Sequence, residues 1–348
     1  MDYQLKDGNI MLKEIEMLFN EDILRGFCDR YEVSIQDINM LGGFDSFVYE
    51  YERDGQDFIL KITHSLRRTS NYIYGEVEWL NYMGDNGVRV SRAIPSKQGN
   101  LIEMIGDEVS YFMAICYEKA VGELPNESHW NKDLFEEWGR ITGQLHRLTK
   151  NYQLNDATYK RNEWHEEEHL QIEKYIPMEQ DIVLEKSKAL INRIKELPKT
   201  VVSYGVIHGD IHHLNFYVDS NNHINLFDFD DIAYNYFIND IAVILFYAYW
   251  RPLKEHEDDQ EFVDSFLKSF LTGYLSENEL DLDWLKQLPD FLRLRHLTQY
   301  IVLLQSVDLD QLEEGEKDFL NHLKVVIEKD YPIVDFPFEQ FVDNYNIK

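Results

Sequence analysis

The chain is short of cysteine, proline, glycine and long apolar runs. Its two cysteines, Cys28 and Cys116, are far apart and form neither a disulfide framework nor a zinc-type pattern. With 8 prolines and 17 glycines the composition is not that of a disordered chain, and the most apolar stretch, 241–250, is about half the length that spans a bilayer. The first residues lack the basic start and apolar run of a signal peptide. These absences predict a soluble, cytoplasmic protein.

Basic residues are also scarce, because 34 lysines and arginines stand against 64 acidic residues, a formal net charge of −30. A surface of this charge repels DNA, RNA and anionic membranes. It would suit a cationic acceptor, although an acidic surface more often serves solubility alone. We therefore expect no nucleic acid and no membrane among the partners.

The residues that are present belong to a folded protein, since 44% are hydrophobic and 14% are aromatic. Helical periodicity predicts a first helix over 11–30. Short β-type runs with turn residues between them follow, interrupted by one helix. The β-type runs are 47–52, 57–63, 101–105 and 109–118, and the helix is 72–85.

After Gly122 the pattern becomes mostly helical. The expected helices are 134–148, 190–197, 236–250, 261–275, 284–306 and 316–329, and the expected short strands are 201–207, 215–218 and 224–227. A strand-rich part followed by a helical part predicts an α+β protein with two lobes. We place the N-terminal lobe at residues 1–118 and the C-terminal lobe at residues 119–348.

The segment with the most chemical information is a tight loop that carries Asp210 and, five residues later, Asn215. The turn at 221–222 returns the chain, so that the strand ending at Asp228 can lie beside this loop. Phosphoryl transfer needs one carboxylate to accept the proton of the attacking hydroxyl, and an amide and a second carboxylate to hold Mg²⁺. The pattern therefore predicts a phosphoryl-transfer site at these three residues.

The motifs His208-Gly-Asp-x-x-x-x-Asn215 and Asp228-Phe-Asp230 resemble the aminoglycoside-phosphotransferase-like family of kinase-fold enzymes. The resemblance extends from about residue 38 to about residue 305. It implies a bilobal, protein-kinase-like fold with an antiparallel sheet in the N-terminal lobe and a mostly helical C-terminal lobe. It also implies that Asp210 is the catalytic base and that Asn215 and Asp228 are Mg²⁺ ligands.

Residues near these motifs look more like the stress-response and spore-coat kinase branches than the antibiotic-resistance enzymes; they are Asp230, Asp231, Asn239 and Asp240. By the same resemblance, Asp240 anchors the backbone of the catalytic loop. We interpret His146 and His208 as structural residues that serve packing and the geometry of the loop. A metal site at His212 and His213 is not favoured, since no Cys or His partner lies at ligand spacing.

A glycine-containing loop in the N-terminal half is expected to form a hairpin over the triphosphate of ATP. Gly42 and Gly43 permit close approach of the backbone, and the hydroxyl of Ser46 can hydrogen-bond a phosphate. The loop lacks the later glycine of the protein-kinase G-x-G-x-x-G pattern, as this family commonly does. Alone, such a loop is more often an ordinary turn.

Lys61 is a lone charge in an apolar strand, and phosphate oxygens would be its partners; the alternative is an edge-strand lysine that points to water. Glu76 shares a helix face with apolar residues, so we expect it, rather than Glu78, to orient Lys61. The segment before Gly122 resembles the family's hinge, where backbone groups around Glu118 and Ala120 would bind adenine.

The acceptor is expected near the acidic segment 161–169. A cationic acceptor could stack on Trp164 and pair with Glu163 or Glu166, although a solvated acidic helix start explains the segment equally well. A later helix over 293–300 carries more polar groups than burial requires, and we take His296 from it as a further acceptor residue.

The sequence thus predicts a phosphotransferase that uses ATP and Mg²⁺ and moves the γ-phosphoryl group to a hydroxyl of a small molecule. A Ser/Thr protein kinase of the stress-response type is the near alternative. A catalytically silent nucleotide-binding scaffold is the alternative from another class. The joint presence of Lys61, Asp210, Asn215 and Asp228 argues against the scaffold, because silent relatives of enzymes usually lose at least one such residue.

Overall fold

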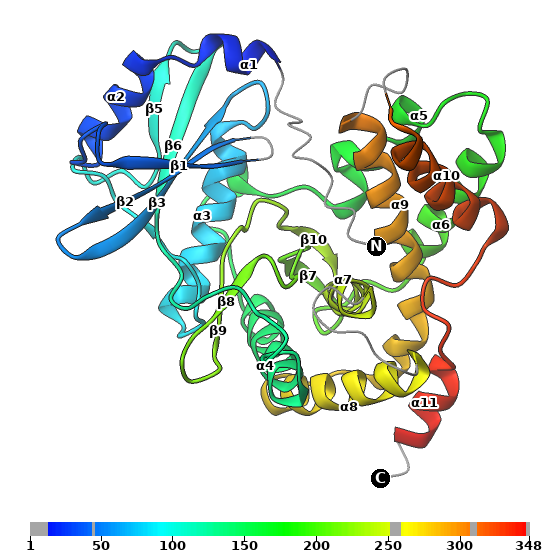
Figure 1. Ribbon diagram of the computed structural model, residues 1–348. Coiled ribbons are helices and arrows are strands. Elements are labelled where there is room, and N and C mark those ends of the chain that lie inside the picture. The colour runs from blue at the N-terminus through cyan, green and yellow to red at the C-terminus, as the bar shows by residue number, and fades with distance from the viewer. Residues whose placement is uncertain (1–12, 44–45, 251–258, 307–311, 346–348) are drawn as a thin grey trace. The chain divides into compact units, whose positions relative to one another are not determined.

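The computed structural model describes residues 13–43, 46–250, 259–306 and 312–345, which form two compact units (Figure 1). The first unit comprises the described residues up to Ala120 together with Gln153–Lys160. The second comprises Val121–Tyr152 and the described residues from Arg161 onward. Within these described ranges, no helix is long and apolar enough to cross a membrane.

The first unit is an antiparallel sheet with a helix packed on each face. Its elements are α1 (Lys13–Leu18), α2 (Glu21–Arg30), β1 (Ile38–Gly42), β2 (Phe47–Arg53), β3 (Gln56–His64), α3 (Ser70–Asp85), β4 (Ala93–Ile94), β5 (Glu103–Gly106), β6 (Tyr111–Glu118) and η1 (Ala157–Tyr159). The strand order is β1-β2-β3-β6-β4, and β5 also pairs with β6. Alternate residues of β2 and β3, such as Tyr51 and Leu60, pack with Phe27 of α2 on one face, which leaves the other face to α3.

The helix expected over 11–30 is two helices, because the chain is interrupted at Asn20. The side chain of Asn20 accepts a hydrogen bond from the N–H of Ile23 at 3.1 Å and so caps the start of α2. Residues 11 and 12 lie outside the described residues.

Residues 153–160 pack with the first unit, although the sequence pattern places them in the second part of the chain. The ring of Tyr159 stacks on that of Tyr74 with 4.9 Å between centroids, and the N–H of Asn155 donates to Glu78 at 2.8 Å. These partners are far away in the chain, so no local pattern indicates the packing.

The second unit is mostly helical, with two small antiparallel ribbons, β7 with β10 and β8 with β9 (Figure 1). Its elements are α4 (Lys132–Thr149), η2 (Trp164–Glu166), η3 (Glu168–Leu170), α5 (Ile172–Tyr175), α6 (Asp181–Lys195), β7 (Tyr204–Ile207), β8 (Phe216–Val218), β9 (Ile224–Leu226), β10 (Ala233–Tyr236), α7 (Phe237–Tyr249), α8 (Asp259–Glu277), η4 (Leu282–Gln287), α9 (Leu288–Ser306), α10 (Glu314–Lys329) and α11 (Phe338–Tyr345). The sequence patterns predict neither β10 nor α11.

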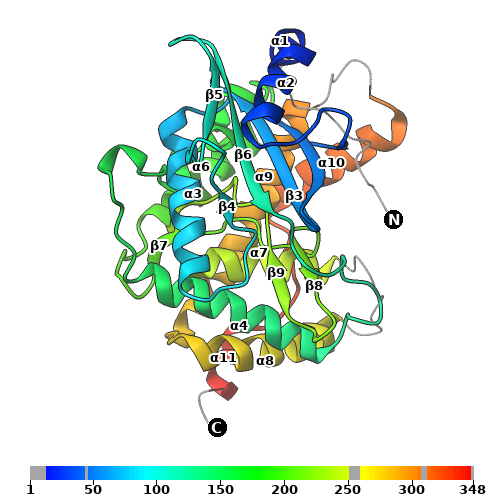
Figure 2. The same ribbon diagram turned by 90° about the vertical axis from the view of Figure 1, so that its left-hand side faces the viewer.

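Helices α4 and α8 lie side by side and approach closely at glycines (Figures 1 and 2). A Cβ atom on Gly139 would lie 1.9 Å from the carbonyl oxygen of Phe270, so no larger residue fits there without a shift of the backbone. Helix α7 is buried along almost its whole length, with Ile241 and Phe246 fully inaccessible. Most of the stretch 241–250 therefore belongs to a core helix, and α7 follows directly on the ribbon that carries the predicted catalytic loop.

Candidate active site

The predicted catalytic loop, residues 208–215, begins directly after β7 and is held through its backbone. The N–H groups of His208 and Gly209 donate to the carboxylate of Asp240 at 3.3 and 2.8 Å. Gly209 has a φ angle of 83°, and a Cβ atom there would lie 2.6 Å from the carbonyl oxygen of Asp231. The prediction that Asp240 anchors this loop is confirmed.

Asp240 is itself fixed by a buried network that begins on α4. His146 contacts Asp240 through Nε2 at 3.0 Å and the hydroxyl of Tyr274 through Nδ1 at 2.8 Å. Both His146 and Asp240 are fully buried, and the imidazole stacks on the ring of Phe237 with 4.5 Å between centroids. His146 therefore supports the loop through Asp240, and not by direct contact. A satisfied buried polar network of this kind gives the loop a single conformation.

The carboxylate of Asp210 has partners on both oxygens. Oδ1 accepts from Nη2 of Arg295 at 2.5 Å, while Oδ2 lies 3.2 Å from Nε2 of His212 and 3.2 Å from Nδ2 of Asn215. Burial by itself would raise the pKa of Asp210, but Arg295 and then His212 lower it well below its usual range. Asp210 is therefore ionised across the physiological range.

Backbone pairing brings Asn215 and Asp228 together, as the sequence predicts. Phe216 pairs with Leu226 in the β8–β9 ribbon, and the N–H of Phe227 donates to the carbonyl of Asn215 at 3.0 Å. Asp228 is the next residue in the chain and has a left-handed backbone conformation, with a φ angle of 60°. The neighbouring Phe229 lies 4.5 Å from the His208 ring, which ties the two motifs together.

The donor set at Asn215 and Asp228 fits a magnesium ion. The amide nitrogen of Asn215 is committed to Asp210, whereas no hydrogen bond to its amide oxygen is recorded within the described residues. Asp228 is exposed, and both side chains offer the oxygen ligands that Mg²⁺ prefers. Within the described ranges, no group of three or more His, Cys, Asp or Glu side chains could hold a metal ion. Phosphate oxygens and water would complete the coordination.

In the first unit, the loop between β1 and β2 is a hairpin connection, as expected. Gly43 has a φ angle of 142°, and a Cβ atom there would lie 1.9 Å from the carbonyl oxygen of Ser46, so the turn requires glycine. Gly42 also has a positive φ angle, 108°, and Ser46 is buried. Residues 44 and 45 lie outside the described residues.

The side chains of Lys61 and Glu76 lie on the same face of the sheet in the first unit. Lys61 lies on β3 between Leu60 and Ile62, which face α2, so its side chain belongs to the α3 face. Tyr117, opposite Ile59 on that face, donates its hydroxyl to Glu76 of α3 at 3.0 Å. Glu76 is 2% exposed, whereas Glu78 is partly exposed and accepts from the backbone outside the sheet. These positions support the choice of Glu76 as the residue that orients Lys61.

The predicted hinge is the end of β6 and the residues after it. The N–H of Glu118 donates to the carbonyl of Arg92 at 2.9 Å, and the N–H of Lys119 donates to the carbonyl of Asp57 at 3.1 Å. No backbone hydrogen bond from the N–H of Ala120 to another described residue is recorded. Ala120 therefore offers a donor to a nucleotide base, while the N–H of Glu118 does not.

Both glutamates that the sequence assigns to the acceptor have structural partners. Glu163 accepts from Lys199 at 2.7 Å and from the hydroxyl of Tyr204 at 2.5 Å, and Glu166 caps its own turn through the N–H of Glu163 at 3.1 Å. Trp164 is 2% exposed, so neither ring face is open to a cation. Their acceptor role stays a prediction that these contacts do not favour.

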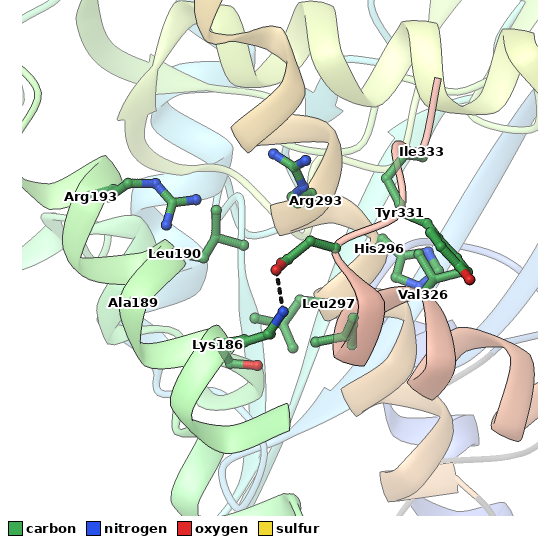
Figure 3. Close-up of a pocket in the computed structure, with 13 residues that line it drawn as sticks. Lys186, Ala189, Leu190, Arg193, Arg293, His296, Leu297, Val326, Tyr331 and Ile333 are labelled. Atoms are coloured by element: carbon green, nitrogen blue, oxygen red, sulfur yellow. Dashed lines mark hydrogen bonds and ion pairs between the residues drawn. The ribbon is translucent and has the colours of Figure 1, made fainter. Parts of the chain in front are cut away.

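His296 lies in a pocket between α6, α9 and α10 (Figure 3). Its Nε2 donates to the carbonyl of Leu323 at 3.0 Å, and Lys186 and Asp330 form an ion pair at the same pocket. The residue of α9 that contacts the catalytic loop is instead Arg295, which the sequence pattern does not single out. The only sequence feature that points to Arg295 is the surplus of polar groups over 293–300. That feature does not indicate which of these side chains faces the loop.

Comparisons with known proteins show the family and the fold of the chain. A family model described as the phosphotransferase enzyme family matches residues 39–288. Amicoumacin kinase of Bacillus subtilis (strain 168) is 42% identical over 332 residues, which cover 95% of this chain and 98% of that protein. The solved structure of the amicoumacin kinase hAmiN in complex with AMP-PNP, Ca²⁺ and Ami has a TM-score of 0.92 at 40% identity, over 95% of this chain and 99% of that one. A microcompartment-associated aminopropanol kinase shares the fold at 18% identity, with a TM-score of 0.68 over 94% and 99% of the two chains.

Proposed function

Because the chain belongs to the phosphotransferase enzyme family, we propose that it transfers the γ-phosphoryl group of ATP to a hydroxyl group of amicoumacin. The family, the kinase-like fold and the enzyme class predicted from the sequence are confirmed, as is the use of ATP with a divalent metal ion. The observation that carries the choice of acceptor is the 42% identity to amicoumacin kinase over almost the whole of both chains. A protein acceptor is not favoured by these relatives.

Asp210 is proposed to accept a hydrogen bond from the acceptor hydroxyl and to orient its oxygen toward the γ-phosphorus. As the new O–P bond forms, the bond to the bridging oxygen breaks, ADP leaves, and the hydroxyl proton passes to the carboxylate. Little proton transfer is needed early in a loose transition state, so an ionised and rigidly held carboxylate suits an orienting role. The buried Asp240 network supports this assignment because it fixes the loop.

Asn215 and Asp228 are proposed to hold Mg²⁺, which when bound neutralises charge on the phosphates. Lys61, oriented by Glu76, is proposed to pair with phosphate oxygens, with Gly42, Gly43 and Ser46 in the loop over the triphosphate. Backbone groups of Glu118 and Ala120 are proposed to bind adenine. For Glu118 this leaves the carbonyl, since its N–H is already donated.

We also propose that the protein works in the cytoplasm, without nucleic-acid or membrane partners, and that its two lobes join between residues 118 and 119. Both cysteines are free and buried, which suits a reducing compartment. The net charge of −30 disfavours polyanionic partners.

The test is direct: the protein is incubated with ATP, Mg²⁺ and amicoumacin, and the acceptor is analysed by mass spectrometry. The expected product carries one added phosphoryl group, and formation of ADP matches it mole for mole. Aminopropanol and a generic protein substrate serve as alternative acceptors. ADP formation with no phosphorylated amicoumacin would show that amicoumacin is not the acceptor, and a phosphorylated protein would restore the protein-kinase alternative.

A further inference from the structure

The carboxylate of Asp210 is contacted from two sides, and residues of its own loop make the contacts on one side. His212 and Asn215, both in the loop, contact Oδ2, whereas Oδ1 receives Nη2 of Arg295 from α9, 85 residues along the chain. The N–H of Leu214 donates to Nδ1 of His212 at 3.1 Å, so the neutral ring carries its proton on Nε2 and donates it to Oδ2. The loop thus satisfies one oxygen, and α9 satisfies the other.

Arg295 is in turn fixed by Tyr247 of α7. The same Nη2 atom donates to the Tyr247 hydroxyl at 2.5 Å, and the guanidinium carbon lies 5.0 Å from the centre of the Tyr247 ring. That ring also lies 4.6 Å from the ring of His212. Asp210, Arg295, Tyr247 and His212 therefore form a closed cycle of contacts that joins the loop to α7 and α9.

We propose that Arg295, held by Tyr247, is a positioning residue for phosphoryl transfer: it fixes the carboxylate of Asp210 against the acceptor hydroxyl. This inference rests on the proposed role of Asp210. A carboxylate accepts about four hydrogen bonds, and three are already made, two on Oδ2 and one on Oδ1. The remaining direction is on Oδ1, so the acceptor hydroxyl binds the oxygen that Arg295 orients.

A stabilising role alone does not explain this ion pair. The side chains of Arg295 and Asp210 are 13% and 17% exposed, so most of each is removed from water. Removal of such charges from water is costly, and packed apolar residues in their place are often as stable. The Nε of Arg295 is also buried and has no hydrogen-bond partner within the described ranges, which adds to that cost. Such a cost is expected where a fixed geometry is needed for a reaction.

The pairing also bears on specificity. The negative charge of Asp210 is balanced by Arg295, which lies against it, so Asp210 is not a counter-ion for a cationic acceptor. We infer that this carboxylate selects a hydroxyl, and that any positive group of the acceptor is recognised elsewhere.

The test compares Arg295→Met, Arg295→Lys and Tyr247→Phe with Arg293→Met, a matched change two residues away on α9. Arg293 pairs with Asp290 at 3.3 Å and lines the pocket of Figure 3. Turnover is measured as ADP formation, which counts transfer to any acceptor, including water. We expect Arg295→Met to lower kcat by about 10- to 100-fold with ATP affinity unchanged, because misplacement of a reacting group costs up to about 10²-fold. Arg295→Lys should recover part of the loss, Tyr247→Phe should cost a few-fold, and Arg293→Met should stay within about twofold.

A double-mutant cycle separates this inference from the proposed function. If Arg295 acts through Asp210, Arg295→Met has no further effect on kcat in the Asp210→Asn background. Wild-type kcat in a folded Arg295→Met protein, or equal losses in both backgrounds, would overturn the inference. Wild-type kcat in Asp210→Asn would instead overturn the role of Asp210. Methylguanidinium added to Arg295→Ala is expected to restore turnover, which it would not do for a purely structural arginine.

Discussion

The predicted catalytic region, residues 208–240, and the acidic segment, residues 161–169, both gather charged side chains, but the charge pairs of the first region join residues farther apart in the chain. In the catalytic region, Asp210 and Asp240 are held by Arg295 and His146, 85 and 94 residues away in the chain. In the acidic segment, Glu166 caps its own turn and Glu168 pairs with Lys174, six residues away, while a longer charge pair joins Glu163 to a part-exposed Lys199, 36 residues away. Local pairing serves the local backbone, whereas groups that converge from distant elements hold one carboxylate in a set geometry. A cluster of charged residues in the sequence is therefore weaker evidence for a functional site than side chains that converge from distant elements.

The largest expected effect of a single change is in the catalytic region, at Asp228. Asp228→Asn should lower kcat by roughly 10³-fold, since a bound metal supplies several kcal/mol of charge stabilisation. It should also remove most of the Mg²⁺ dependence of ATP binding, as measured by calorimetry with and without the metal. Turnover that still rises normally with Mg²⁺ would mean that Asp228 is not a metal ligand.

Asp240→Asn tests whether the buried network holds the catalytic loop. The amide cannot accept from His208, Gly209 and His146 together, so we expect the free energy of unfolding to fall by about 2–3 kcal/mol. Turnover should fall about tenfold. Chemical denaturation measures the first effect, with Asp264→Asn on the exposed face of α8 as the control, expected to cost below about 1 kcal/mol. Equal losses for the two variants would contradict the comparison.

The double change Glu163→Gln and Glu166→Gln tests the acidic segment. If these side chains serve structure, KM for the acceptor should change less than about twofold, and stability should fall by about 1 kcal/mol or less, the scale of part-exposed pairs. Steady-state kinetics with amicoumacin and with aminopropanol give the answer. A large rise in KM for a cationic acceptor, with ATP affinity unchanged, would restore the acceptor role predicted from the sequence.

His296 is a buried titrating group outside both regions. Its replacement should have the smallest of the expected effects, a change in how stability depends on pH. Burial lowers the pKa of His296 below its usual value, although its bond to the carbonyl of Leu323 opposes this. As the pH falls below about 6.5, the unfolded chain therefore binds a proton at His296 more readily than the folded chain does, so this part of the stability is lost on acidification.

In His296→Gln that loss is absent, so its stability should fall less steeply between pH 7.5 and 5.5 than that of the wild type. The difference in slope should be at most about 1.4 kcal/mol per pH unit. Asn321→Gln, at an exposed position on α10, changes no titrating group, and this control should follow the wild type. Parallel curves for the wild type and His296→Gln would contradict the account.

Local patterns predict most of the fold and bring together the main candidate residues of the site. Hydrophobic periodicity and turn residues predict β2, β3, α3 and most helices of the second unit, although not α11. The spacing of Asp210, Asn215 and Asp228 predicts that the loop carrying the first two lies beside the end of the strand that leads to Asp228. Patterns of this kind carry no information on long-range packing. They therefore miss the stacking of Tyr159 on Tyr74 and the choice of Arg295 rather than His296 at the loop. They also miss the Asn20 cap, which divides the first helix, because an apolar period continues through it.

The central claim is that the loop 208–215 performs phosphoryl transfer, and Asp210→Asn tests it most directly. Calorimetric affinity for ATP with Mg²⁺ and turnover are measured on the same folded preparation, with circular dichroism to confirm the fold. We predict nearly unchanged affinity together with a fall in kcat of roughly 10² or more, the usual scale for loss of a general base. Turnover near the wild-type value on the true acceptor would contradict the account.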